Sequence, residues 1–169
     1  MSDFKKRDED EIEHELQAWF FGVHKVVIAG IGNSLRRDDF VGVKIVRDLQ
    51  DTVSSSVYLI ECETVPENFI EPIIRFNPSH VLIIDAALLN LEPGSTKLLS
   101  SKQLMERQAV STHALPLRIF CEYLARETKA KIALLLIQPG DTRFGEGLTR
   151  EVQNTSDCIV KLLSRFLRM

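Results

Sequence analysis

The sequence predicts a three-layer α/β/α sandwich around a mostly parallel, twisted sheet of about five strands. Two observations support this fold class. The chain contains several short segments that are almost wholly apolar. These segments alternate along the chain with segments in which apolar residues recur at helical spacing. Strands that are covered by helices on both faces are apolar in this way, and such sheets are mostly parallel.

The composition fits one compact domain rather than a membrane protein or a nucleic-acid-binding protein. The 169 residues are 44% hydrophobic, and the net charge is -3. The longest apolar stretches, at 81–89 and 132–137, are much shorter than the roughly 20 residues that span a bilayer. No secretion signal is evident, and three scattered cysteines suit a reducing compartment. We therefore expect a cytoplasmic protein with no nucleic acid partner and no membrane insertion.

Residues 1–22 are predicted to form an N-terminal helical extension, separate from an α/β domain at 23–169. A charged start leads into 11–22, where the residues at helical spacing are Ile12, Leu16, Trp19 and Phe20. The favoured interpretation is a helix packed on the main domain. The alternative is a docking scaffold that exposes the aromatic triplet at 19–21 to a partner.

The first half of the domain contains two predicted strands and two predicted helices. Residues 25–31 are a β-branched apolar run that ends in a tight glycine loop, which indicates a buried strand. Apolar residues at helical spacing predict a helix over 41–49, and 57–62 is predicted as the second strand. A short helix is expected over 68–76, ending before Pro78 because the residue before proline disfavours the helical conformation.

The second half continues the alternation. Residues 81–85 are apolar up to a final aspartate and predict a third buried strand, and a fourth strand is expected at 95–99 after a turn. A helix over 115–127 tolerates a proline in its first turn, and 131–137 is another buried strand. The C-terminal helix is predicted over 147–168, with an apolar face made of Val152, Cys158, Ile159, Leu162, Leu163 and Phe166.

Polar residues follow the predicted strands, where open α/β sheets bind their ligands. Asp38 and Asp39 come after the first strand, Asp85 ends the third, and His113 lies in a loop before a helix. Each has an ordinary explanation, since one acid of the pair could cap a helix, Asp85 a loop, and the histidine could be a surface residue. Together they are expected on one rim, because the carboxyl ends of parallel strands share an edge.

Two carboxylates and one imidazole suit a divalent transition metal with open coordination positions. The same set suits water activation at a peptide carbonyl, with a carboxylate as general base. The chain has no His-Glu-x-x-His and no Cys-x-x-Cys, so a tightly held structural metal is not expected.

Two other chemistries are disfavoured. Gly30 and Gly32 resemble the start of a dinucleotide fingerprint with Glu61 as the ribose acid, but the acidic pair at 38–39 would repel a pyrophosphate. Cys62 stands between two glutamates that would raise its pKa, so it is interpreted as a buried apolar residue. His24 and His80 precede strands and are interpreted as unremarkable edge residues, and no Gly-x-Ser-x-Gly is present.

Several motifs resemble the hydrogenase maturation endopeptidases, which remove a C-terminal peptide from the large subunit of nickel–iron hydrogenases. The resemblance covers residues 24–168 in family order and spacing. The segments that carry it are 29–35 with Asp38, Asp39 and Gly42, then 64–68, 82–86, 92–94, 111–117 and 137–139. The segments 64–68 and 112–117 are most similar to the branch that processes hydrogenase-3-type and related membrane-bound enzymes.

The resemblance implies an aspartic-type endopeptidase whose catalytic and metal-contacting residues are Asp39, Asp85 and His113. The implied substrate is a folded large-subunit precursor that already carries nickel and is cleaved after a basic residue near its C-terminal metal-binding cysteine. The nickel belongs to the substrate, so no tightly bound cofactor of the enzyme itself is expected. One carboxylate, Asp39 by preference, would activate water. The alternative is a non-catalytic α/β module that binds a metal or a nucleotide.

Two departures from the family pattern bear on the site. Phe40 stands where the family has glycine, and it is interpreted as narrowing the site or contacting the substrate tail. Arg36 and Arg37 replace a more neutral stretch, and they are interpreted as lowering the pKa of the carboxylates or binding an acidic segment.

Overall fold

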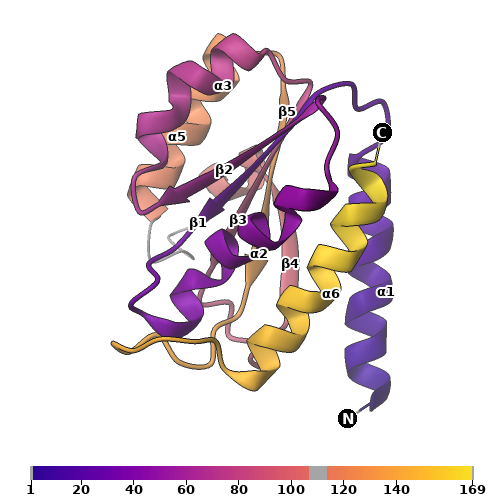
Figure 1. Cartoon of the computed structure of the whole chain (residues 1–169), viewed down its shortest axis with the longest axis vertical. Helices are drawn as coiled ribbons and strands as arrows, with labels where there is room; N and C mark the ends of the chain where they lie inside the picture. The colour runs from indigo at the N-terminus through magenta and orange to yellow at the C-terminus, as the bar shows by residue number, and fades with distance from the viewer. Residues whose placement is uncertain (1, 107–113, 169) are drawn as a thin grey trace.

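The structure is a computed structural model that describes residues 2–106 and 114–168. Five strands form one sheet in the order β2-β1-β3-β5-β4 (Figure 1). Neighbouring strands are parallel except for β4, which pairs antiparallel with β5. The strands are β1 Val26–Ile31, β2 Val57–Glu63, β3 His80–Ala86, β4 Thr96–Ser100 and β5 Lys131–Ile137. The predicted fold class is confirmed.

Helices cover both faces of the sheet, with α1, α2 and α6 on one side and α3 and α5 on the other (Figure 1). The α-helices are α1 Ser2–Trp19, α2 Val41–Leu49, α3 Ile70–Phe76, α4 Ser101–Glu106, α5 Ala114–Glu127 and α6 Arg150–Phe166. Short 3-10 turns are η1 Arg37–Phe40, η2 Gln50–Thr52 and η3 Pro66–Phe69. Within these described ranges, no helix is long and apolar enough to cross a membrane.

The element boundaries differ from the predictions in a few places. Helix α4 follows β4 directly and was not predicted, because six residues are too few to show a helical period. The predicted helix at 68–76 begins as the 3-10 turn η3, with Pro66 in its first turn. Helix α6 begins at Arg150 rather than at Gly147, whose φ of +82° lies in the left-handed region.

Two apolar cores lie on the two faces of the sheet. Successive residues of each strand point alternately into one core and into the other. In β1, Val26 and Ile28 face the core under α1, α2 and α6, while Val27 and Ala29 face the core under α3 and α5. All six residues of β1 and all seven of β3 are buried. The central strands are therefore covered on both sides, as their apolar composition predicts.

Helix α1 packs on the main domain. Ile12, Leu16 and Phe20 are buried in the first core, and the ring of Phe20 stacks on Phe166 at 5.0 Å. This confirms the favoured interpretation of the N-terminal segment. Of the aromatic triplet at 19–21 only Phe21 is exposed, so the apolar face of α1 stabilises the fold rather than forming a docking patch. The division of the chain at residue 22 remains a prediction.

The predicted apolar face of α6 is wrong at Cys158, which is exposed and lies 3.7 Å from a carboxylate oxygen of Glu9. The buried stripe passes through Val152, Ser156 and Ile159 at helical spacing. Cys158 is one residue, or roughly 100° of rotation, away from that stripe.

His80 is also not the edge residue that the sequence indicated. It is the first residue of β3, it is buried, and its Nδ1 lies 2.9 Å from the hydroxyl of Ser79. The ring of Trp19 on α1 meets it edge-on at 4.9 Å. Burial lowers the pKa of His80 and the charge of Lys131 lowers it further, while the backbone of Trp19 opposes the shift. The sequence could not show this, because the cover comes from a distant helix.

We expect His80 to make the fold sensitive to acid. Its pKa is lower in the folded chain than the ordinary value near 6.5, so unfolding takes up a proton below that pH. The stabilisation is complete above about pH 6.5 and is lost as the pH falls through the folded-state pKa, with a slope of at most about 1.4 kcal/mol per pH unit. Urea unfolding from about pH 7 to about pH 5 should show a shallower loss of stability for His80→Phe than for the wild type. Equal slopes would contradict this assignment.

Candidate active site

The sheet has its topological switch point beside β1. The chain passes from β1 to β2 on one side and then to β3 on the other, so the connections that follow β1 and β3 diverge. Ligands of open α/β sheets bind in the crevice that such divergence leaves at the carboxyl ends of the strands. Asp39 follows β1 in η1, and Asp85 is the last residue but one of β3. One acid therefore follows β1 and the other lies near the end of β3, the two strands that flank the switch point.

A glycine contact holds these two segments together. A β-carbon on Gly42 would lie 2.1 Å from the carbonyl oxygen of Ile84 and 2.5 Å from that of Ile31. The first turn of α2 therefore rests directly on the ends of β3 and β1, which no larger residue would allow. Because Gly42 comes three residues after Asp39, and Ile84 immediately precedes Asp85, this contact brings both acids to the same edge of the sheet.

Both acids are buried. Asp39 is 3% exposed, and its Oδ2 accepts a hydrogen bond from the backbone N–H of Asn33 at 3.0 Å. Asp85 is 0% exposed within β3. Burying a carboxylate is costly unless polar partners or a metal compensate. Two buried carboxylates at a ligand-binding edge are thus the strongest chemical feature of this end of the molecule.

His113 lies outside the described residues, so its convergence with the two acids remains a prediction. Helix α5 begins immediately after it at Ala114. The helix ends four residues before Lys131, and the N–H of Lys131 donates to Ser79 beside the start of β3. Helix α5 thus runs antiparallel to the strands and begins at their carboxyl ends. Among the residues described, which exclude His113, no three His, Cys, Asp or Glu side chains are grouped to hold a metal.

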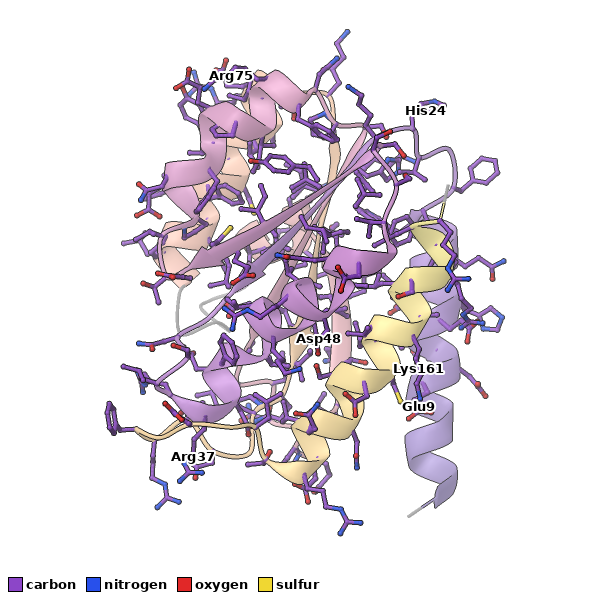
Figure 2. The ribbon with its side chains drawn as sticks, in the orientation of Figure 1. Glu9, His24, Arg37, Asp48, Arg75 and Lys161 are labelled. Atoms are coloured by element: carbon purple, nitrogen blue, oxygen red, sulfur yellow. The ribbon has the colours of Figure 1, made fainter. Side chains whose placement is uncertain are left out.

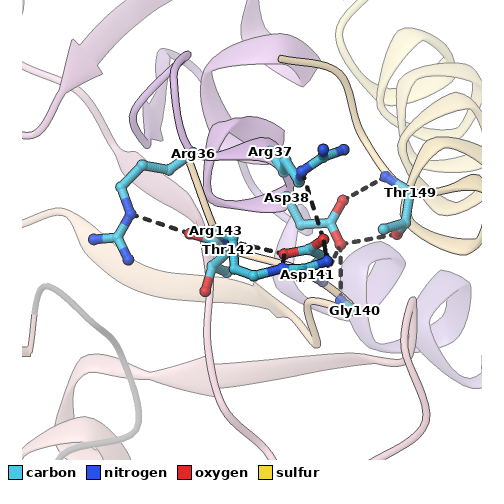
Figure 3. A network of polar contacts seen from close by, with 8 residues as sticks. All are labelled: Arg36, Arg37, Asp38, Gly140, Asp141, Thr142, Arg143 and Thr149. Carbon is cyan, nitrogen blue, oxygen red and sulfur yellow. Dashed lines mark hydrogen bonds and ion pairs between the residues drawn. The ribbon is translucent and has the colours of Figure 1, made fainter. Parts of the chain in front are cut away.

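Asp38, the other acid of the pair at 38–39, binds the loop before α6 (Figure 3). Its Oδ2 accepts hydrogen bonds from the N–H groups of Gly140 and Asp141 at 2.8 and 2.9 Å and from the hydroxyl of Thr149 at 2.8 Å. Its Oδ1 accepts the N–H of Thr149 at 2.7 Å. Asp38 is completely buried. Its four partners satisfy a carboxylate that would otherwise destabilise the fold.

The prediction that one acid of the pair caps the following helix is wrong. The N-cap positions of η1 and α2 are Arg36 and Phe40, and neither makes a side-chain capping bond. Asp38 instead reaches across to Thr149, the N-cap residue of α6. A long-range partner of this kind cannot be identified from local sequence.

The two arginines of this segment contact the same loop. Arg36 donates from Nε to the carbonyl of Thr142 at 3.1 Å, and Nε of Arg37 lies 3.5 Å from a carboxylate oxygen of Asp141. Arg143 binds Asp141 more closely, at 2.8 and 3.0 Å, and holds the pKa of that carboxyl well below its usual range, with Arg37 adding to the effect. The carboxyl whose pKa falls is therefore Asp141, outside the predicted trio.

The structure also offers observations that weigh against the dinucleotide and thiol interpretations. A β-carbon on Gly30 would lie 2.2 Å from the carbonyl oxygen of Gly42, so the first glycine serves helix packing. Glu61 is bound by Arg47 at 2.7 Å and by Gln50 at 3.2 Å. Burial, with a smaller effect of Glu67, raises the pKa of Cys62 to about 12, which disfavours the thiolate that a nucleophile needs.

Sequence reasoning missed the role of Gln138. This nearly buried side chain follows β5, and its Oε1 accepts the N–H of Leu89 at 2.7 Å and that of Leu91 at 3.4 Å. It therefore fixes the loop that follows Asp85. The sequence signals were a polar residue at the end of an apolar strand and its place in the family segment 137–139.

We expect Asp38→Ala to unfold more easily than the wild type by about 2–4 kcal/mol, because removing one buried acceptor leaves four partly buried donors without their partner. Asp141→Ala is the matched control from the same network. Its loss should be much smaller, since its main partner Arg143 is 85% exposed. Urea denaturation measures both. Equal losses would show that Asp38 is not the central acceptor.

Comparison with known proteins agrees with this architecture. The family model described as "Hydrogenase maturation protease" matches residues 43–165. A protein of Methanocaldococcus jannaschii assigned to the hydrogenase maturation proteases is 35% identical over 147 residues, covering 82% of this chain and 86% of the relative. The hydrogenase 3 maturation protease of Escherichia coli K12 is 26% identical over 137 residues, covering 81% and 87%.

The solved structures agree as well. The NiFe hydrogenase maturation protease HycI from Thermococcus kodakarensis KOD1 superposes with a TM-score of 0.82 at 31% identity, over 90% of this chain and 97% of that one. The enzyme class predicted from the motifs, a hydrolase acting as an endopeptidase, is confirmed. The chain belongs to the hydrogenase maturation protease family.

Proposed function

We propose that this enzyme removes the C-terminal extension from the nickel-loaded precursor of a hydrogenase large subunit. The observation that supports the proposal is the pair of buried carboxylates, Asp39 and Asp85, at the switch point of the sheet. The relative from Escherichia coli is named for hydrogenase 3. We therefore take a hydrogenase-3-type large subunit as the first client to test.

In the proposed complex, Asp39, Asp85 and His113 contact the nickel that the precursor carries. Carboxylate oxygens and an imidazole nitrogen are suitable ligands for a divalent transition metal with open positions. The metal is part of the substrate, and the enzyme supplies only the groups that recognise it. A precursor without nickel would lack the centre that aligns its scissile bond. The enzyme would then be specific for the nickel-loaded precursor, because only that substrate brings the metal that completes the site.

Peptide hydrolysis then needs a general base beside the aligned bond. A carboxylate accepts a proton from water as the water oxygen attacks the peptide carbonyl, and the departing amine takes up a proton as the carbon–nitrogen bond breaks. We assign the base to Asp39, because it keeps a small exposed fraction whereas Asp85 keeps none. The backbone N–H of Asn33 donates a hydrogen bond to Oδ2 of Asp39 and so fixes the orientation of this carboxylate.

The test is mass spectrometry of the client precursor incubated with the full-length chain, with nickel and without it. We expect cleavage of the nickel-loaded form alone. Asp39→Asn, Asp85→Asn and His113→Ala should each slow cleavage by about 10²–10⁴-fold, the usual cost of losing a catalytic acid or base.

Cys158→Ser is the control, because this exposed thiol lies on α6 and takes no part in the proposed site. Its cleavage rate should match the wild type. If His113→Ala and Asp39→Asn cleave the precursor at the wild-type rate, the trio is not the active site. If the nickel-free precursor is cleaved equally well, metal recognition is wrong.

A further inference from the structure

Several exposed apolar side chains follow the carboxyl ends of the parallel strands, the end of the sheet at which the two buried acids lie. One or two of them follow the carboxyl end of each parallel strand, and another stands in the first turn of α5. The set, here called the hydrophobic rim, is Leu35 after β1, Val65 after β2, Leu88 and Leu91 after β3, Phe144 after β5 and Leu115 on α5. Scattered exposed apolar residues need no explanation, but a group around one site indicates an interaction surface.

Phe144 is the most exposed member of the rim, with 82% of its surface accessible. The loop that carries it is nonetheless held firmly. Gly145 donates its N–H to the carbonyl of Leu35 at 2.8 Å and accepts the N–H of Arg37 at 3.0 Å, and Asp38 donates to the carbonyl of Asp141 at 3.0 Å. The carboxylate of Asp38 binds the base of the same loop (Figure 3).

These contacts keep an aromatic ring in solvent on a fixed support. No packing in the described part of the fold requires the ring, since so little of it is buried. A loop whose backbone is held in place before binding loses less conformational freedom when a partner covers it. Aromatic side chains presented in this way are typical anchors of protein interfaces.

We propose that the hydrophobic rim is the docking surface for an apolar face of the folded hydrogenase precursor, with Phe144 as its anchor. This proposal rests on the proposed function. The rim surrounds the active-site acids, so a protein whose chain is cut there must contact it. Its members come from five separate segments around the site, which fits the face of a folded protein better than one extended peptide.

The surroundings of Phe144 match the usual anatomy of an interface, in which polar groups border an apolar centre. Arg36 is exposed, and its Nε binds Thr142 while its two terminal nitrogens have no partner within the described part of the chain (Figure 3). Arg143 is exposed and fixed by Asp141. Both arginines therefore offer donors at the edge of the rim.

The rim and the trio should act on different kinetic constants. Docking contacts are the same in the bound precursor and in the transition state, so their loss raises KM and leaves kcat unchanged. Loss of the general base lowers kcat. The two roles can therefore be separated in one assay.

The matched pair of variants is Phe144→Ser and Phe21→Ser. Phe21 is 80% exposed, nearly the same as Phe144, but it precedes β1 at the other end of the sheet. His24, three residues after Phe21, and Arg37, which lies against Gly145, stand at opposite ends of the molecule in Figure 2. Both substitutions leave the buried cores intact, and unchanged thermal unfolding verifies the fold.

We expect Phe144→Ser to raise KM for the nickel-loaded precursor by about tenfold or more, the cost of losing an interface anchor, with kcat within about twofold of wild type. Phe21→Ser should leave both constants unchanged. An unchanged KM for Phe144→Ser, or equal increases for the two variants, would overturn the docking surface.

Binding of the precursor by an Asp39→Asn enzyme, with and without Phe144→Ser, separates this proposal from the proposed function. Weaker binding caused only by Phe144→Ser supports the rim even if Asp39 proves not to be the base. No measurable binding by the Asp39→Asn enzyme overturns the rim.

Sedimentation of the enzyme alone provides a further check. A dimer that Phe144→Ser dissociates while precursor binding stays unchanged would identify the rim as a self-association surface and overturn the proposal.

Discussion

The site depends on one close contact between backbones, where the first turn of α2 lies on the ends of β1 and β3. Gly42 touches the carbonyl oxygens of Ile31 and Ile84, and Gly30 touches the carbonyl of Gly42 in turn. A side chain at either glycine would force the helix away from the sheet, and protein cores tolerate such overpacking poorly. The distance between the segments that carry Asp39 and Asp85 is therefore fixed by the absence of two side chains.

Asp38 connects the segment after β1 to the loop that carries Phe144. Its neighbour Asp39 is the proposed general base, while the carboxylate of Asp38 binds the loop at 140–149 and the start of α6. The same loop pairs with residues 35–37 and presents Phe144. One acid of the pair thus organises the surroundings, and the other is left for chemistry. Gln138 plays a similar part for the loop after Asp85. Buried polar groups that are fully satisfied rigidify a structure in this way.

The sequence predicted the features that repeat locally or follow a general rule. Apolar runs predicted the four parallel strands, and the rule about strand ends indicated Asp85 and the pair Asp38 and Asp39. The family resemblance then implied Asp39 rather than Asp38. What it could not predict depends on partners distant in the chain. The bonds from Asp38 to Thr149, the cover of His80 by Trp19 and the exposure of Cys158 are of this kind. The position of His113 on the same rim stays a prediction, and its role in the site is what the family resemblance implies.

The two proposals together divide recognition of the precursor between two surfaces of different chemistry. The buried acids can distinguish a metal, because hard oxygen ligands respond to charge and coordination. They cannot by themselves identify which protein carries that metal. The hydrophobic rim supplies the missing information, because apolar complementarity over several segments is specific to shape. A protease with both requirements would cut only where a nickel centre and a matching protein face occur together. Such selectivity does not require a deep peptide groove, since the folded substrate itself closes the site.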